Sequence, residues 1–448
     1  MQPWLQEKRG VFCLKNLLPR VKSFQMDLRS RKAGQGLTAR KLSLGSGGAW
    51  ETRIICWFSL ALVALGAWQR FCPQALAREE KQERHSSQAA ADTLFTNGVV
   101  HILKIAIPKE GVQSLRRNPR TYVKATLQEG SSRFTNVMVR LKGGAGSFRD
   151  FDDKPGLTLK LEEAGSTFHG LRKFHLNNSV QDSTYLSEWF CSELFCQAGV
   201  PAARVAHAVV ELNGRRLGLY ALLESINSDF LARYFKNNHG NVYSLGANAD
   251  INQGLDRMGG REPTTGRELE VLAAIARETD VARLQSQLPQ VLDVERFLSF
   301  MAVEVMLDHW DGYTFNVKNY EVYHDLDTGR MVFMPHDLDQ VLRNPNAPIM
   351  PQVRGLVARA ILRNPQTRAA YQARFAELAS RLFVAPDLTR RIDQRAALLQ
   401  TGLKNYDSNL AREVIDEAGS LKSRIHRRAQ SLAAQLKSAR TGQGSAPQ

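Results

Sequence analysis

The spacing of the hydrophobic residues changes along the chain, and this change limits the possible folds more than any other feature of the sequence. Between residues 99 and 162, apolar and polar residues alternate in short runs, which is typical of β-strands with one buried face. Beyond about residue 263, the apolar residues mostly recur every three or four positions, as they do in helices that pack on a core. A strand-rich first half followed by a helix-rich second half predicts an α+β fold with two lobes.

Turn residues and helix ends support this division of the chain. The pair Asn213-Gly214 separates two strand-like runs and is the strongest short signal for a β-hairpin. The stretch 183–198 repeats apolar residues every four positions and is followed by a glycine, so it predicts a helix. In the second half, the runs 319–325 and 331–335 predict a small hairpin among the helices.

The N-terminal part of the chain has the composition of an export signal rather than of a folded domain. Residues 1–53 carry eleven Lys or Arg against three acidic residues and show no periodicity, so we expect disorder there. The uninterrupted apolar run 54–68 has fifteen residues, which is short for a membrane span and typical of a signal sequence. Small residues at 75–77 fit a cleavage site. We therefore interpret 54–77 as a signal sequence or a membrane anchor, and both alternatives remain open.

The rest of the chain divides into a linker, a domain and a tail. We predict a polar linker over 78–95, a folded domain over 96–430 and a disordered tail over 431–448. A basic flank usually stays on the cytoplasmic side, so the residues that follow the apolar run should cross the membrane. We expect the folded domain outside the cytoplasm of a bacterial cell, either secreted or anchored in the membrane by the N-terminal apolar segment.

The charge distribution argues against nucleic acid as a partner. Nearly all of the formal net charge of +16 belongs to the two ends of the chain, and residues 54–350 are close to neutral. The basic residues occur without zinc-finger spacing or an RNA-binding signature. The five cysteines form no CxxC pair, which favours buried free thiols over a disulfide framework or a metal site.

The segment 309–339 concentrates the residues that could carry chemistry. Asp311 and Asn316 lie five residues apart, and Asp337 and Asp339 follow the predicted hairpin. In this order, kinases place a catalytic aspartate, a metal-binding asparagine and a metal-binding aspartate around one phosphoryl group. Magnesium prefers oxygen ligands, usually one or two carboxylates together with phosphate. The same residues could instead cap polar turns, and the spacing alone does not separate these readings.

Upstream segments add residues that could contact phosphates. A strand-like run ends in the stretch "KGGAGSFR", where Gly144 and Gly146 would let backbone N–H groups approach phosphate oxygens. Basic residues border this stretch, and a strand lysine and a helix glutamate follow it: Arg140, Lys142, Arg149, Lys160 and Glu188. In kinases, such a lysine and glutamate orient the nucleotide phosphates. Each of these features also has a simpler explanation. The Gly-rich stretch could be a hairpin turn, Lys160 could lie on a solvated strand face, and Glu188 could be an exposed acid in the first turn of a helix.

Several stretches of the sequence together resemble the CotH family of spore-coat-type atypical protein kinases. They are "YVKATL", "VRLKGGAGSFRDFDDKPGLTLKL", "FHLNNSVQDSTYLSEWFCSELFCQAGVPA", "LNGRRLGLYALLE" and "MPHDLDQVL". The resemblance covers roughly residues 98–430 with the order of segments kept. It implies a divergent two-lobed protein-kinase-like fold with a strand-rich N-terminal lobe and a helix-rich C-terminal lobe. It also implies transfer of phosphate from ATP to Ser of a protein partner, with Mg²⁺ or Mn²⁺ as the metal ion.

The resemblance assigns roles to particular residues. Asp311 would be the catalytic aspartate, and Asn316 and Asp337 would bind the metal ion. Asp339 would be a second ligand or a turn cap. Residues near the nucleotide would be Arg140, Lys142, Gly144, Gly146, Lys160 and Glu188. The sequence departs from the family pattern at His336, where an aromatic residue is usual, and in "NVKNY", which replaces adjacent asparagines.

Two functions of different classes fit these observations. An active kinase is favoured because the metal-binding carboxylates are intact. A catalytically inactive kinase-like scaffold that binds a surface or coat protein is the alternative, and His336 is the residue that supports it. A carboxylate-based hydrolase fits poorly, because Asp337 and Asp339 would point the same way on an extended chain and leave no room for substrate between them.

Overall fold

The computed structural model describes residues 82, 85–163, 165–244, 249–253, 256–260 and 266–440. The predicted basic segment 1–53 and the predicted signal sequence or anchor 54–77 lie outside these residues. In the part of the chain that is described, no helix combines the length and the apolar character needed to cross a membrane. Strands dominate the first half and helices the second, which confirms the predicted α+β fold class.

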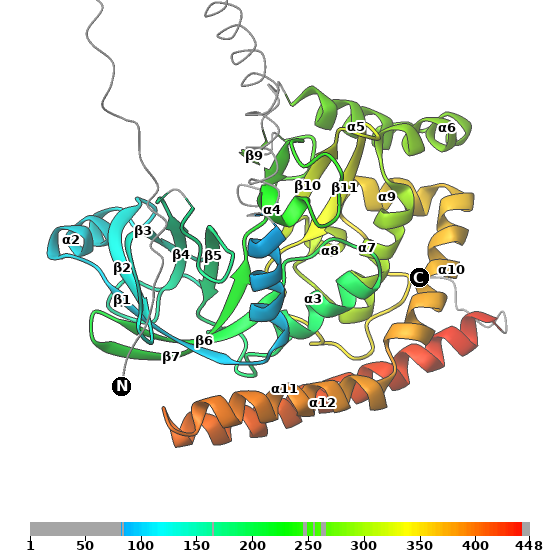
Figure 1. Ribbon diagram of the computed structural model, residues 1–448. Coiled ribbons are helices and arrows are strands. Elements are labelled where there is room, and N and C mark those ends of the chain that lie inside the picture. The colour runs from blue at the N-terminus through cyan, green and yellow to red at the C-terminus, as the bar shows by residue number, and fades with distance from the viewer. Residues whose placement is uncertain are drawn as a thin grey trace, which may run out of the picture. The chain divides into compact units, whose positions relative to one another are not determined.

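A closed barrel of β-strands forms the first half of the described chain (Figure 1). Its strands are β1 (Val100–Ala106), β2 (Val123–Glu129), β3 (Ser132–Lys142), β4 (Gly156–Leu161), β5 (Lys173–Asn177), β6 (Val205–Leu212) and β7 (Arg215–Glu224). The order is β1-β2-β3-β4-β5-β7-β6, and a parallel pairing of β1 with β6 closes the barrel. Helix α2 (Lys109–Arg117) connects β1 to β2. Asn213 and Gly214 both have positive φ, as the predicted two-residue hairpin turn requires.

Alternate side chains of these strands fill the barrel interior. Leu103, Leu127, Val139, Leu159 and Leu176 are all fully buried in one hydrophobic cluster. Successive side chains of a strand point to opposite faces, so every second residue reaches the interior. This geometry accounts for the alternating pattern in the sequence.

A helix over 85–96 packs on the barrel and corrects the predicted domain boundary at residue 96. Three of its side chains are buried in the barrel core: Ala91, Leu94 and Phe95. Asp92 of the same helix forms an ion pair with Arg204. The polar composition of 78–95 suggested a linker, but a few apolar residues three and four positions apart are enough to attach one helix face to the core.

Outside the barrel, helices surround a smaller sheet. This sheet has the order β11-β10-β8-β9. Its strands are β8 (Val242–Ser244), β9 (Asp256–Gly259), β10 (Tyr320–Asp325) and β11 (Arg330–Pro335). The helices are α3 (Ser187–Gln197), α4 (Ser228–Leu231), α5 (Arg267–Arg277), α6 (Val281–Val291), α7 (Val294–Leu307), α8 (Tyr313–Asn316), α9 (Leu356–Arg363), α10 (Pro365–Leu382), α11 (Ala385–Leu403) and α12 (Ser408–Arg440).

Helix α7 lies at the centre of this second hydrophobic core. Every side chain from Phe297 to Leu307 is buried, because other elements cover the helix on all sides. Helix α10 buries one apolar stripe: Tyr371, Phe375, Leu378 and Leu382. Helix α12 continues to Arg440 and buries Leu432, so the predicted domain end at residue 430 is too early.

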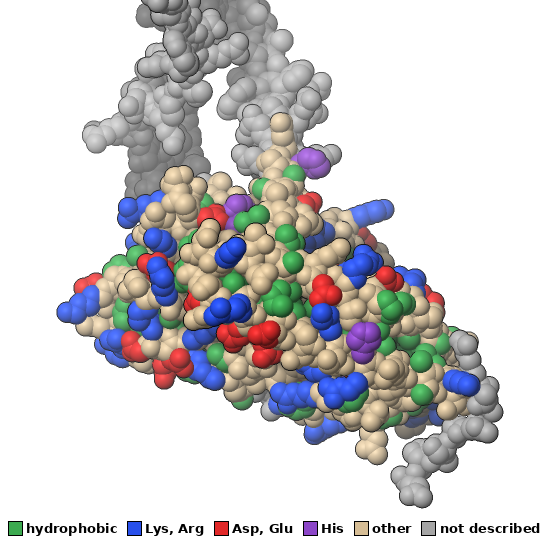
Figure 2. Space-filling view, turned by 90° about the horizontal axis from the view of Figure 1, so that it is seen from below, with side chains coloured by type: hydrophobic (Ala, Val, Ile, Leu, Met, Phe, Trp, Pro, Cys, Tyr) green, Lys and Arg blue, Asp and Glu red, His purple; other side chains and the backbone are tan. Residues whose placement is uncertain are grey.

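The charged residues of the C-terminal helices are mixed rather than gathered. On the face shown in Figure 2, Lys and Arg side chains lie among Asp and Glu, and hydrophobic side chains are scattered. Along α11, Arg390 pairs with Asp387, and Lys422 of α12 pairs with Asp393. The basic excess of this part of the chain therefore does not form a continuous basic surface on that face.

Candidate functional site

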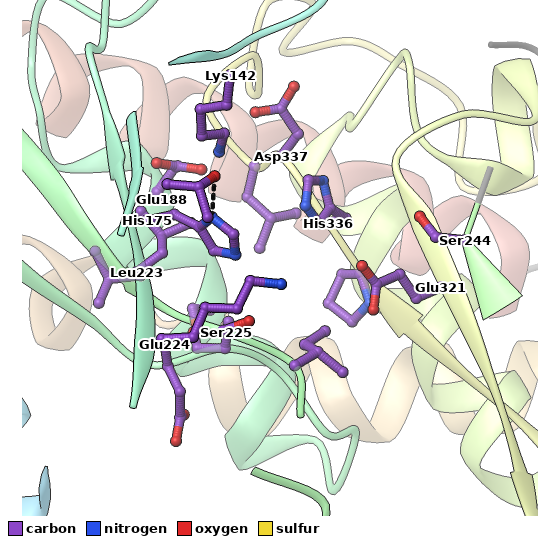
Figure 3. A pocket seen from close by; sticks show the side chains of 18 of the residues that line it. Lys142, His175, Glu188, Leu223, Glu224, Ser225, Ser244, Glu321, His336 and Asp337 are labelled. Atoms are coloured by element: carbon purple, nitrogen blue, oxygen red, sulfur yellow. Dashed lines mark hydrogen bonds between the residues drawn. The ribbon is translucent and has the colours of Figure 1, made fainter. Parts of the chain in front are cut away.

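A cavity lies between the barrel and the β10–β11 hairpin (Figure 3). The barrel contributes basic and polar side chains from β3, β4 and β5: Arg140, Lys142, Thr158, Lys173 and His175. The hairpin contributes Glu321 from β10, and His336 and Asp337 from the residues after β11. Helix α3 contributes Glu188. Residues far apart in the sequence thus face one another across a single space.

The barrel wall of the cavity is basic. The guanidinium of Arg140 lies 4.9 Å from the centroid of the Tyr122 ring. Its buried Nε has no hydrogen-bond partner among the described residues. Burial lowers the pKa of Lys173, and burial raises the pKa of Glu321 opposite to about 7. Buried donors of this kind are suited to an anion that enters the cavity.

Lys142 is connected to Glu188 through Asn177. The ammonium of Lys142 donates to Oδ1 of Asn177, whose Nδ2 lies 2.7 Å from both carboxylate oxygens of Glu188. Glu188 is only 3% exposed. Burial, reinforced by the charge of Asp337, raises the pKa of Glu188 to about 8. The amide of Asn177 therefore fixes the direction of the lysine toward the cavity.

The expected pairing of Lys160 with Glu188 does not occur. The side chain of Lys160 is 49% exposed and forms an ion pair with Glu162 at 2.6 Å. In the register of the sheet, Lys160 lies opposite Met138, whereas Lys142 lies opposite Gly156. Since each residue advances a strand by about 3.4 Å, Lys160 lies four residues, or about 14 Å, farther along the sheet than Lys142. Lys142, and not Lys160, is therefore the strand lysine that is connected to Glu188.

The Gly-rich loop after β3 has the backbone freedom that its sequence predicts, but its glycines do not line the cavity. Gly146 has φ +89°, and a Cβ there would lie 2.7 Å from Nε2 of Gln181, so only glycine fits. The guanidinium of Arg149 donates to the carbonyls of Gly146 and Phe148. Gly144 and Arg149 thus shape the loop instead of facing the cavity, and Arg140 and Lys142 are the basic residues that do.

His309 lies beside both Asp311 and Asp337. It is fully buried after the end of α7, with Nδ1 at 3.5 Å from Glu304 and Nε2 at 3.5 Å from Asp311. Nε2 also lies 3.2 Å from the backbone carbonyl of Asp337. Burial lowers the pKa of His309, but the close contact with Glu304 and the charges of Glu304 and Asp311 outweigh this, and the net shift is upward. One buried imidazole therefore connects Asp311 to Asp337.

The carboxylates around Asp337 repel one another. Burial, together with the charges of Asp337 and Glu188, raises the pKa of Asp339 to about 9. Burial also raises the pKa of Asp311, with a further contribution from Asp337. Buried carboxylates gathered in this way keep their charge only if a cation lies among them, so these oxygens fit a divalent metal ion.

The asparagine side chains differ from the sequence prediction. Oδ1 of Asn316 accepts a hydrogen bond from Arg354 at 3.0 Å, and Nδ2 donates to the carbonyl of Trp310 at 2.6 Å. The predicted ligand oxygen is therefore already engaged. The side chain of Asn319 instead lies beside Asp311 and acts to lower the pKa of that carboxyl against the effect of burial, and the carbonyl of Asn319 accepts from the backbone N–H of His336. Asn319 lies directly before β10 and opposite the end of β11. This position relative to the predicted hairpin is the sequence signal that could have identified it.

Comparisons with known proteins give one family. A family model described as CotH kinase protein matches residues 139–432. The chain is 27% identical to the inner spore coat protein H of Bacillus subtilis over 186 residues, which are 39% of this chain and 51% of that protein. It is 22% identical to the invasin CotH2 of Rhizopus delemar over 316 residues, 63% of this chain and 53% of that protein. The chain thus spans about half the length of the curated relatives it matches.

Among solved structures, the comparison finds a crystal structure of the Helicobacter pylori proinflammatory kinase CtkA. The match has 9% sequence identity and a TM-score of 0.29. It covers 62% of this chain and 94% of that chain.

Proposed function

The chain belongs to the family described as CotH kinase protein, and we propose that it is an atypical protein kinase that transfers the γ-phosphate of ATP to a serine of a protein partner. One observation carries this proposal: a single cavity has a basic wall on the barrel side and carboxylates on the hairpin side. The phosphates of ATP require the basic wall, and the divalent cation that accompanies ATP requires the carboxylates.

Mg²⁺ or Mn²⁺ is the metal ion that fits the acidic side of the cavity. Asp337, which lines the cavity, and Asp339, which does not line it but whose charge interacts with that of Asp337, would supply carboxylate oxygens, and a cation would relieve their mutual repulsion. Asn319, which acts on the pKa of Asp311, is a further source of an amide oxygen, because Oδ1 of Asn316 accepts a hydrogen bond from Arg354. When bound, the ion neutralises charge on the transferring phosphoryl group.

The chain's own residues perform the remaining tasks. Asp311 accepts the proton of the attacking serine hydroxyl, and His309 holds its carboxylate in position. Lys142 and Arg140 bind phosphate oxygens, with Lys142 directed by Asn177 and Glu188. This division of work agrees with a two-lobed kinase-like arrangement in which the barrel binds nucleotide and the segments before and after the β10–β11 hairpin carry Asp311 and Asp337.

We also propose that the domain acts outside the cytoplasm, exported or anchored through 54–77. The basic flank and short apolar run support this location. The names of the two relatives, a spore coat protein and an invasin, agree with it. A reporter enzyme fused after residue 80 should be found outside the cytoplasm, and a wholly cytoplasmic reporter would contradict the proposal.

The experiment that tests the function compares Asp337→Ala with Asp311→Asn. Asp337→Ala removes a metal ligand, so metal-dependent ATP binding and phosphate transfer should both be lost. Asp311→Asn removes the proton acceptor alone, so transfer should slow by about 10²–10⁴-fold while affinity for Mg-ATP stays near normal. Calorimetry measures the affinity, and autophosphorylation from labelled ATP measures the transfer.

The control is Asp416→Asn, because Asp416 is an exposed carboxylate on α12. This variant should behave as the unmodified protein in both assays. Melting temperatures separate loss of function from loss of fold. Transfer that persists in both active-site variants would remove the kinase assignment of this cavity. ATP binding without transfer in the unmodified protein would favour an inactive scaffold instead.

A further inference from the structure

Two histidines and a glutamate meet on the barrel, among residues that do not line the cavity. His101 lies on β1, Glu129 ends β2, and His169 belongs to the turn between Phe168 and Leu171. Three segments that are far apart in the sequence thus place chemically active side chains at one point.

The three side chains are in direct contact. Nδ1 of His101 is hydrogen-bonded to Oε1 of Glu129, and Nε2 of His169 lies 2.7 Å from Oε2 of the same carboxylate. The two imidazole rings are 4.9 Å apart between centroids. One ligand atom from each residue lies within 4.8 Å of the other two. A single carboxylate therefore stands between two ring nitrogens.

One side of this group is buried in the protein, and the other side is accessible to solvent. His101 is 5% exposed, whereas the side chains of Glu129 and His169 are 20% and 37% exposed. Nε2 of His101 is buried and has no hydrogen-bond partner within the described part of the chain. A hydrogen-bonded role for this ring would usually employ both nitrogens, and here only the nitrogen that faces Glu129 is employed. Water can reach the group from the side of His169.

The turn that carries His169 is held in an uncommon conformation. His169 has φ +45°, a region that few residues other than glycine adopt. Phe168 pairs with Leu171 across the turn and stacks on Phe174 at 4.9 Å between centroids. A Cβ on Gly170 would lie 1.9 Å from the carbonyl oxygen of Ser87, so the turn also fits closely against the helix over 85–96. The packing thus presents His169 to Glu129 before any ligand arrives.

From this geometry we propose that His101, Glu129 and His169 form a binding site for a transition-metal ion of the Zn²⁺ class, with water as a further ligand. Two imidazole nitrogens and one carboxylate are a donor set that zinc uses and that magnesium avoids. Tetrahedral zinc with bonds of about 2.1 Å holds its ligand atoms about 3.4 Å apart, so the 2.7 Å contact opens by less than about 1 Å.

The site would strengthen a connection that the hydrogen bonds of Glu129 already make between β1, the end of β2 and the turn at 168–171. An ion there links β1 and the end of β2 to the turn at 168–171, and through Gly170 to the helix over 85–96. Bound metal stabilises whichever state holds the preformed site. This role is structural, and it does not depend on the proposed kinase activity.

The test measures zinc binding to the purified full chain by equilibrium dialysis, without ATP. We use Asp337→Ala as the background, so that the cavity carboxylates contribute less. We expect one equivalent of Zn²⁺, a higher melting temperature with zinc, and no such effect of Mg²⁺. His169→Asn and Glu129→Gln should each weaken zinc binding at least about 10-fold. Asparagine also tolerates positive φ, so the first variant keeps the turn.

The matched control is His426→Asn, because His426 is an exposed histidine on α12. It should bind zinc as tightly as its background. X-ray absorption of the zinc-loaded protein gives a second measurement that needs no variant, and it should show two imidazole ligands. Absence of a zinc equivalent, equal binding by both variants, or a spectrum without imidazole would each overturn the site and leave a hydrogen-bonded group only. None of these results bears on Asp311 or on phosphate transfer.

Discussion

At the scale of single residues, His207 on β6 shows how burial fixes a protonation state. It is fully buried, with Nε2 donating to the carbonyl of Tyr185 at 2.7 Å and Nδ1 accepting from Arg395 at 3.2 Å. Both contacts require a neutral ring with its proton on Nε2. Burial, with the nearby charge of Arg395, lowers the pKa of His207 to about 3.

This lowered pKa predicts loss of stability in acid. Above the unfolded-state pKa of about 6.5 the ring is neutral in both states, and the contribution of His207 is complete. Between about 6.5 and 3 only the unfolded state gains the proton, so the free energy of unfolding falls by at most about 1.4 kcal/mol per pH unit. Compared with His207→Gln, the protein should lose about 2 kcal/mol more between pH 7.5 and pH 5 in denaturant titrations. Equal losses in the two proteins would show that the ring is charged when folded.

Two lysines on neighbouring strands give a matched pair of variants. Lys142→Met removes the cation that Asn177 and Glu188 direct into the cavity, and phosphate transfer should fall by about 10²-fold. Lys160→Met alters an exposed residue paired with Glu162, so transfer should stay within about 2-fold. Both rates are measured with labelled ATP under the same conditions. If Lys160→Met reduced the transfer rate by more than about 2-fold, Lys160 would belong to the active site after all.

At the scale of elements, helix α12 supports the segment that carries the catalytic candidates. Arg428 is fully buried and donates to the carbonyls of Val305 and Met306 in the last turn of α7, at 2.7 and 3.0 Å. It also donates to the carbonyls of Pro345 and Ala347, in the segment after Asp339. One guanidinium thus connects α12 to both sides of the acidic group.

Arg428→Met tests this connection. The variant leaves several buried carbonyls without their donor, so the free energy of unfolding should fall by about 3 kcal/mol. Transfer should fall more than affinity for ATP, because His309 and Asp311 follow the turn that Arg428 holds. The neighbouring Arg427→Met is the control, since Arg427 is exposed on the same helix. If the two variants have the same melting temperature, α12 does not support the site.

At the scale of the whole molecule, the folded unit begins earlier than composition suggests. The helix over 85–96 buries Leu94 and Phe95 in the barrel core. It also places Phe95 beneath the guanidinium of Arg204, 4.5 Å from the ring centroid. Burying two such side chains contributes about 4 kcal/mol.

Truncation measures that contribution. A protein of residues 96–448 should unfold at lower denaturant concentration than one of residues 82–448, by about 4 kcal/mol in free energy of unfolding. Removal of 441–448 alone is the control at the other end. Coincident unfolding curves for the proteins 82–448 and 96–448 would show that the helix does not belong to the core.

The sequence by itself determined the fold class, and it singled out the acidic residues of the proposed site. Alternation and four-residue repeats are local, because each depends only on which face of its own element is buried. For this reason the strands of the barrel, the turn at Asn213-Gly214 and the stripe of α10 could all be predicted. Asp311 and Asp337 could be found for the same reason, since both directly follow or precede buried elements.

The tertiary structure alone decided which of several similar residues reach the cavity. Alternation puts Lys160 on the same face as Thr158, but only strand register places it beyond the site and brings Lys142 to Glu188. In the same way, the contact of Asn319 with Asp311 depends on which residues of the hairpin lie opposite each other. The meeting of His101 with His169 depends on closure of the barrel and on one strained turn. These are contacts between distant segments, and no local pattern in the sequence encodes their distances.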